Sequence, residues 1–354
     1  MYAIRFYRIY DIGAEIDLGS LERQLAESMA IARAGFVRVS PKSISMEEPP
    51  LLLRLQPAYL EMDGQGYTFT AIARVFDVGA FSICLIYENA GGSALQLEAA
   101  ALKFSGQKNL DPLFHAALAQ VKAILTTELG DRPLDPDFYE DYTIYLVDRL
   151  DGSMDPVAVL LGERANFSPE TRNDTLRYTL SYEQDDRAII SWDGTILASP
   201  QMPFDLVDLV EFATVEVFEL RFYDRELSRQ MEKMYDDIEM ADRLSWYYRV
   251  RQYRRIMKRL MSTQAEISEI MEKITNLIKV TEDVYYARVY ATTLTALRSQ
   301  QWIDGVNRRI SVIRETYRLL SEEVTVQHSN FLEWIVILLI AIELILFLFT
   351  ALIP

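Results

Sequence analysis

The sequence has one cysteine, Cys84, and only two histidines, His115 and His328, among 354 residues. A single cysteine excludes an intramolecular disulfide and fits a reducing compartment. The two histidines lie in different regions, so the chain carries no His/Cys zinc cluster and no visible histidine-based triad. Cys84 sits in the apolar run 81–87, where we expect a small core residue rather than a nucleophile.

Glycine-rich phosphate loops are also absent, since neither G-x-x-x-x-G-K-[ST] nor G-x-G-x-x-G occurs. One acidic run, 131–141, holds five carboxylates and could bind a divalent cation, but it lacks the spacing of a calcium loop. Its two prolines favour a solvated loop. The sequence therefore predicts no catalytic residue, no cofactor and no metal ligand.

Proline is missing between Phe204 and Ile353, and Gly305 is the single glycine there. This composition predicts long helices. Apolar positions step by four and three from Ile256 to Val284, and again from Ile303 to Phe331. Two such ladders predict an antiparallel coiled-coil hairpin with its tip near 280–295.

The run from Trp334 to Ile353 has twenty residues, of which only Glu343 and Thr350 are polar. Twenty helical residues span about 30 Å, the thickness of the hydrocarbon core of a bilayer. Its fifteen Leu, Ile, Val and Phe residues favour insertion by roughly 7 kcal/mol, against roughly 3 kcal/mol for a central acid. We expect a transmembrane anchor; the alternative is a buried helix of a soluble protein.

Charge is unevenly distributed. Residues 1–240 contain 40 acids and 21 bases, whereas 241–330 contain 15 bases and 10 acids. An acidic body is a poor general nucleic-acid binder, so no direct DNA binding is expected. One segment of the basic region packs six bases into eleven residues: Arg249, Arg251, Arg254, Arg255, Lys258 and Arg259. These bases either form a solvated helix face or contact anionic lipid headgroups or RNA.

The first two hundred residues read as an α+β body. Strand patterns occupy 2–10, 36–39, 51–55, 59–62, 66–76, 79–88, 142–147 and 195–198, with a hairpin over 176–192. Helical spacing occupies 21–32, 94–103 and 112–129, and Ser20 is a plausible N-cap. The domains expected are an α+β body over 1–203, a helical coiled-coil hairpin over 204–330 and an anchor over 331–354.

Glu343 is expected near the middle of the bilayer, where an acid usually faces protein rather than lipid. Each chain has one span, so a partner for Glu343 must come from another chain. We therefore predict a homo-oligomer, with Glu343 and Trp334 as contact residues of the anchors. The alternative is a lone acid tolerated in lipid.

The segment His328-Ser-Asn-Phe-Leu-Glu-Trp334, followed by an apolar run and Glu343, resembles the C-terminal signature of the "required for meiotic nuclear division" (RMD/YagE-like) family. The segments 306–313, 74–81 and 205–227 resemble further parts of that family, and the resemblance covers most of the chain. The chain departs from the family near Thr281, where members commonly carry a proline. The resemblance implies a non-enzymatic membrane protein, whose mitochondrial relatives support organelle translation and are thought to tether ribosomes.

Together these features predict a single-pass protein of the inner (plasma) membrane with its body in the cytoplasm. The chain starts in a strand pattern, so we expect no signal peptide. The favoured function is a homo-oligomeric scaffold or tether that contacts membrane lipid and recruits a protein partner such as the ribosome. The alternative is a membrane-tethered enzyme with its site in the α+β body, using the carboxylate run.

Overall fold

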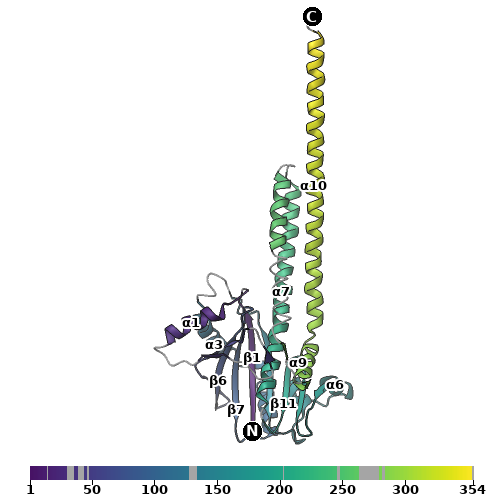
Figure 1. Ribbon diagram of the computed structural model, residues 1–354. Coiled ribbons are helices and arrows are strands. Elements are labelled where there is room, and N and C mark those ends of the chain that lie inside the picture. The colour runs from purple at the N-terminus through teal and green to yellow at the C-terminus, as the bar shows by residue number, and fades with distance from the viewer. Residues whose placement is uncertain are drawn as a thin grey trace. The chain divides into compact units, whose positions relative to one another are not determined.

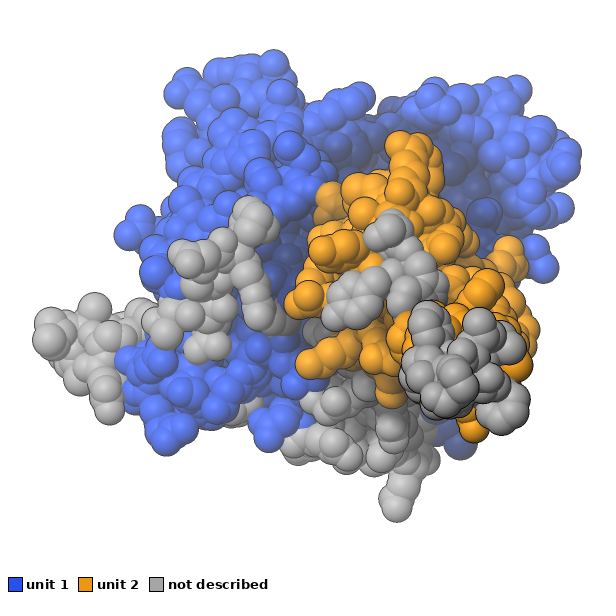
Figure 2. Space-filling view, turned by 90° about the horizontal axis from the view of Figure 1, so that it is seen from above, with its two compact units in different colours: residues 1–222, 272–302 blue, residues 223–271, 303–354 orange. Residues whose placement is uncertain are grey.

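The computed structural model describes residues 1–13, 15–29, 36–38, 44–45, 48–126, 134–201, 203–244, 248–262, 279–280 and 284–352. The chain divides into two compact units, shown in separate colours in Figure 2. We call residues 1–222 with 272–302 the body, and residues 223–271 with 303–354 the helical unit. Figure 1 labels the elements of both.

The body carries all the described strands. Their bounds are β1 (Tyr2–Asp11), β2 (Phe36–Arg38), β3 (Ile44–Ser45), β4 (Leu51–Arg54), β5 (Ala58–Met62), β6 (Gln65–Val75), β7 (Ala80–Asn89), β8 (Glu140–Val147), β9 (Tyr178–Leu180), β10 (Arg187–Ile190), β11 (Gly194–Ala198) and β12 (Lys279–Val280). One sheet has the strand order β2-β4-β6-β7-β1-β8-β11-β10-β9, with β5 also paired to β6. All its pairings are antiparallel except that of β8 with β11.

The helices vary from one turn to more than fifty residues. Their bounds are α1 (Leu18–Met29), α2 (Ala94–Lys103), η1 (Ser105–Gln107), α3 (Asp111–Ile124), α5 (Pro156–Leu161), α6 (Pro169–Thr175), α7 (Phe204–Asp242), α9 (Val284–Ala296) and α10 (Ser299–Leu352). A further helix covers 248–262. The long helix α7 contributes its residues up to Phe222 to the body and the remainder to the helical unit.

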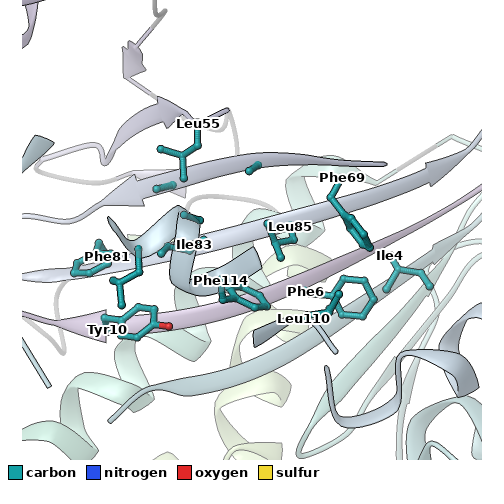
Figure 3. Packing of buried hydrophobic residues seen from close by; sticks show 14 of the residues in the cluster. Ile4, Phe6, Tyr10, Leu55, Phe69, Phe81, Ile83, Leu85, Leu110 and Phe114 are labelled. Atoms are coloured by element: carbon teal, nitrogen blue, oxygen red, sulfur yellow. The ribbon is translucent and has the colours of Figure 1, made fainter. Parts of the chain in front are cut away.

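The central strand β1 is buried on both faces because β7 and β8 flank it and helices cover each side. Its side chains alternate with the period of two that a strand requires. Ile4, Phe6 and Tyr10 join one apolar cluster with residues of α2 and α3, as Figure 3 shows in part. Ala3 and Ile9 join the opposite cluster, which the first half of α7 and α9 complete. The body is thus a sheet between two helical layers.

Most of the predicted elements of the body are confirmed, and Cys84 is buried as expected. The hairpin predicted over 176–192 is the antiparallel pair β9–β10. The turn between β6 and β7 contains Gly79 with φ of 106°, a conformation that glycine adopts without strain. The first helix begins at Leu18 rather than after Ser20, and the Asp17 carboxylate accepts from the Ser20 N–H at 2.9 Å. The short helices α5 and α6 were not predicted.

The helical unit has its own apolar core, made by three helices. Leu227, Met234 and Ala241 come from α7, and Tyr253, Ile256 and Leu260 come from the helix over 248–262. The third contribution follows the predicted ladder of α10, whose buried members are Val306, Ile310, Ile313, Leu320 and Val324. The second ladder is therefore confirmed as buried between Val306 and Val324, whereas its last member, Phe331, is 42% exposed.

The predicted hairpin tip near 280–295 is wrong. Residues 284–296 form α9, which buries Val289, Thr293 and Ala296 in the body. Val284, expected on the seam of the first ladder, is 83% exposed. The part of that ladder from 263 to 281, apart from 279–280, lies outside the described residues. The periodicity predicted the helices, but not which neighbour each helix packs against.

Candidate functional site

Polar contacts set the register of α10 against α7 in the helical unit. Arg309 of α10 pairs with Asp224 of α7, 85 positions earlier, and its Nε donates to Ser228 Oγ, 81 positions earlier, at 2.8 Å. Gly305, one turn before Arg309, lies against Asp224, one turn before Ser228, so the two helices run parallel. The close approach is made at Gly305, where an added Cβ would lie 2.9 Å from Asp224 Oδ1. By this offset, the end of α7 is level with about residues 323–327 of α10.

The helix over 248–262 runs back along α7. Tyr253 donates its hydroxyl proton to Asp242, and Arg259 Nη1 donates to Asp237 Oδ2 at 2.5 Å. As the residue number rises from Tyr253 to Arg259, the number of the partner on α7 falls from Asp242 to Asp237. The two helices are therefore antiparallel. The segment that follows Asp242 is thus the end of the helical unit that lies nearest to Phe331, at a distance along α10 of about 3–12 Å.

The six predicted surface bases fall into two groups. Arg251, Arg254, Arg255 and Lys258 are exposed and spaced i, i+3, i+4 and i+7, so they share one face of the helix. Arg259 is exposed but held by Asp237, and Arg249 is half-buried. The structure therefore gathers four of the six into one basic face, which we call the basic stripe. Its Arg251 end is nearer to Phe331 than its Lys258 end.

Helix α10 is long and apolar enough to cross a membrane, by length and composition. From Phe331 to Ile345 each described side chain is exposed, including Trp334 at 69%. Glu343 also lies on this exposed stretch. Trp334 and Glu343 are nine positions apart, which places them on opposite sides of the helix. One helix–helix contact therefore cannot include both residues.

A buried ion network joins the sheet to α7 in the body. Arg74 of β6 donates to Glu211 at 2.5 Å and to Asp208 at 2.6 Å, and Ser82 of β7 donates to Glu211 at 2.5 Å. Burial raises the pKa of Glu211, and the Arg74 charge opposes that rise. Because Arg74 is only 6% exposed, its two carboxylate partners are what make its burial tolerable.

Three further carboxyl groups of the body, Asp11, Glu216 and Glu219, have raised pKa values. Burial is the largest cause of the raised pKa of Asp11 and of Glu219, and the nearby Asp11 carboxylate raises the pKa of Glu219 further. Burial also raises the pKa of Glu216 to about 7, although the Tyr290 hydroxyl donates to it. Sequence reasoning missed these groups; the only signal was an acidic residue every three to five positions on the buried face of α7.

A cavity of about 540 Å³ opens in the body between the β9–β10 turn, the start of α7 and the start of α9. Tyr182 and Tyr285 line it with ring centroids 5.3 Å apart. Its Arg187 donates to two backbone carbonyls, and its Asp186 accepts two backbone N–H groups. Aromatic faces beside these charges make it a space for a small organic group.

The acidic run over 131–141 is only partly described, because 131–133 lie outside the described residues. Within the described part, Glu140 pairs with Arg221 of α7 and Asp135 accepts from the Asp137 N–H at 3.2 Å. Among the described residues, no group of three or more His, Cys, Asp or Glu is placed to hold a metal ion.

The class that these features define is a mixed α+β sheet body followed by long C-terminal helices, one of which is apolar enough to span a membrane. The chain belongs to the family described as the N-terminal domain of "Uncharacterized protein MJ0711", whose model matches residues 1–205. The chain is similar to the protein of that name from Methanocaldococcus jannaschii, with 25% identity over 222 residues. That match covers 59% of this chain and 66% of the relative, just under two thirds. No solved structure matches.

The family match ends at residue 205, within the first residues of α7. It therefore covers the sheet, while the helical unit lies outside it. Neither description names the required-for-meiotic-nuclear-division family, so that resemblance remains a prediction.

Proposed function

We propose that the chain is a membrane-anchored homo-oligomeric scaffold or tether, held by α10 in the inner (plasma) membrane with its body in the cytoplasm. The observation that carries the proposal is the continuous exposed apolar surface of α10 from Phe331 to Ile345. Soluble proteins rarely expose contiguous apolar patches larger than a few hundred Å². Lipid is the solvent that such a helix requires.

The basic stripe supports contact with anionic lipid. Each base near an anionic surface contributes about 1 kcal/mol, and the attraction decays over a Debye length of about 8 Å at physiological salt. Arg251 is close enough to the anchor to feel that surface, whereas Lys258 lies about 10 Å further along its helix. Lipid contact is therefore expected to weaken along the stripe.

Oligomerisation is proposed to involve both sides of the anchor. Glu343 favours a protein neighbour at mid-bilayer, because lipid offers a polar group no partner. Trp334, on the opposite side, would then face a different neighbour. A dimer buries one of these sides, while a ring of three or more anchors can use both. We therefore favour an assembly larger than a dimer.

The scaffold role, with a partner such as the translation machinery, rests on the family resemblance and on the acidic body. An acidic surface attracts basic partners and repels nucleic acid. The alternative, a membrane-tethered enzyme with a site in the body, would place its substrate in the cavity beside Tyr182.

The test starts from membranes of cells that express the full chain. We expect the protein to resist extraction by alkaline carbonate, and crosslinking followed by mass spectrometry to recover copies of the chain with one recurrent protein partner. Deletion of residues 331–354 should release it. Carbonate-soluble full-length protein would contradict the anchor, and a purified protein with turnover or stoichiometric metal would favour the enzyme.

A further inference from the structure

Three exposed large apolar side chains of the helical unit, apart from those of the apolar run of α10, lie at the end where α7 finishes and the helix over 248–262 starts. Met240 is 57% exposed, Leu244 is 43% exposed and Tyr248 is 59% exposed. We call these three residues the apolar tip. Met240 and Leu244 are four positions apart, so they share one side of their segment. The core cluster of the same unit is made by other residues.

The position of the apolar tip relative to the anchor follows from the register of the three helices. Leu244, two residues beyond Asp242, is level with about residues 325–329 of α10. At 1.5 Å per residue this is about 3–9 Å before Phe331. The headgroup layer on each side of a bilayer is about 5–8 Å thick. The apolar tip thus coincides with that layer if Phe331 marks the edge of the hydrocarbon. Val326 of α10, 54% exposed, lies at the same level.

The chemistry of the apolar tip suits the headgroup layer. Tyrosine is enriched at membrane interfaces, where its ring is buried and its hydroxyl stays hydrated. Arg243 and Arg251 flank it, and arginine can extend its charged end toward phosphates while its stem covers apolar surface. Two acids lie beside them and both are engaged: Glu239 is paired with Arg243 at 2.5 Å, and Asp242 accepts the Tyr253 hydroxyl proton.

We propose that the apolar tip is a second membrane-contact element, which lies in the headgroup layer beside the anchor and holds the helical unit at a defined angle to the bilayer. The proposal rests on the proposed membrane anchoring through α10. Its occupant is the lipid surface itself, because the tip and Val326 lie at one level, about 3–9 Å before the apolar run that starts at Phe331. A single helix can rotate and tilt in a bilayer, whereas a helix with a second contact at its side is constrained.

The experiment uses the full chain in vesicles of phosphatidylcholine and phosphatidylglycerol. The variants L244C, I340C and M261C are each labelled with an environment-sensitive thiol dye, and quenching by lipids brominated at different depths is measured. The native Cys84 need not be replaced, because it is buried and burial raises its pKa to about 12. Met261 is a matched control, since it is 56% exposed but is displaced from Phe331 by roughly 15–20 Å.

We expect the dye at position 340 to be quenched by deep bromines, the dye at 244 by shallow bromines, and the dye at 261 by neither. An unquenched dye at 244 beside a quenched dye at 340 overturns the proposal while leaving the anchor intact; the tip would then be a surface for a protein partner. Unquenched dyes at both positions overturn the anchor and the proposal together. Equal quenching at 244 and 261 shows a helical unit lying on the membrane, which also contradicts a tip-only contact.

Discussion

At the scale of single residues, the body depends on charges that are buried between its sheet and α7. Arg74, Glu211 and Asp208 form an ion network in which each member compensates the burial of another. A buried pair contributes little against an apolar replacement, but the loss of one partner leaves an uncompensated charge. This asymmetry makes the network sensitive to single substitutions.

The first prediction is that Arg74→Met destabilises the body by about 3–5 kcal/mol, because Glu211 and Asp208 lose their counter-charge. Denaturant unfolding in detergent, followed by circular dichroism, measures the change. The matched control is Arg318→Met, since Arg318 is exposed and pairs with exposed Glu315 and Glu322; it should cost much less, because exposed ion pairs contribute little to stability. Equal losses would show that the network carries no special weight.

The second prediction concerns pH. When folding raises the pKa of a carboxyl group, its protonated form stabilises the folded protein at pH values below the pKa that the group has in the unfolded chain. This stabilisation is lost as the pH rises through the pKa of the folded state. For Glu216, with a pKa raised to about 7, the loss between pH 5 and pH 8 should reach about 3 kcal/mol. Glu216→Gln should remove this part of the pH dependence, whereas Glu239→Gln, at an exposed position, should leave it. Thermal melting curves recorded from pH 5 to pH 8 test this prediction. If the stability of Glu216→Gln depends on pH as strongly as that of the parent chain, Glu216 is not the group responsible.

At the scale of elements, two helices of the helical unit carry the proposed function. The helix over 248–262 presents the basic stripe, and α10 presents the apolar run. Their roles are separable, since the stripe acts through long-range charge and the run through burial in lipid.

The third prediction is a gradient along the basic stripe. A soluble chain ending at Asn330 should bind anionic vesicles at low salt and lose binding when all six predicted bases are replaced by serine. Arg251→Ser should weaken binding by about fivefold, equivalent to about 1 kcal/mol. At physiological salt, where the Debye length is about 8 Å, Lys258→Ser should have a smaller effect, because Lys258 lies about 10 Å further from the headgroups along its helix. Co-sedimentation gives the affinities, and equal effects of the two variants would favour a stripe that lies flat on the surface.

The fourth prediction is that Glu343→Leu weakens self-association of the anchor, since a mid-bilayer acid finds its partner on another chain. A membrane two-hybrid assay or sizing in detergent measures association. Thr350→Leu removes the other polar residue of the run and serves as the control. If Glu343→Leu associates as well as the parent chain, the contact lies in the helical unit or the body.

At the scale of the whole molecule, the proposal predicts the sidedness of the chain. Arg308, Arg309, Arg314 and Arg318 precede the apolar run, which the positive-inside rule associates with the cytoplasmic side.

The fifth prediction is therefore that protease added outside spheroplasts spares the body, while the same protease digests it after lysis. A periplasmic reporter protein should be degraded in both samples. Digestion of the body in intact spheroplasts would place it outside the cytoplasm and refute the orientation.

The elements of the body could be predicted because their signals are local. The alternation of β1, the turn at Gly79 and the apolar seam of α10 depend on period and turn chemistry within a few residues. The candidate anchor was equally visible, since length and apolar composition define it. The sequence was sufficient to name the six bases. It could not predict that four of them share one exposed face, that Arg259 is paired with Asp237 and that Arg249 is half-buried.

What the sequence by itself determined is where helices and strands form and which face of each is apolar, because both follow from the period of the side chains. Tertiary structure alone decided that residues 284–296 pack against the sheet, and that α7 turns acids such as Glu211 and Glu219 inward. An apolar face is compatible with many neighbours, and a buried acid is stable only beside a counter-charge or a proton supplied by a distant segment. For Glu211 that counter-charge is Arg74, 137 residues away, and no local pattern records it.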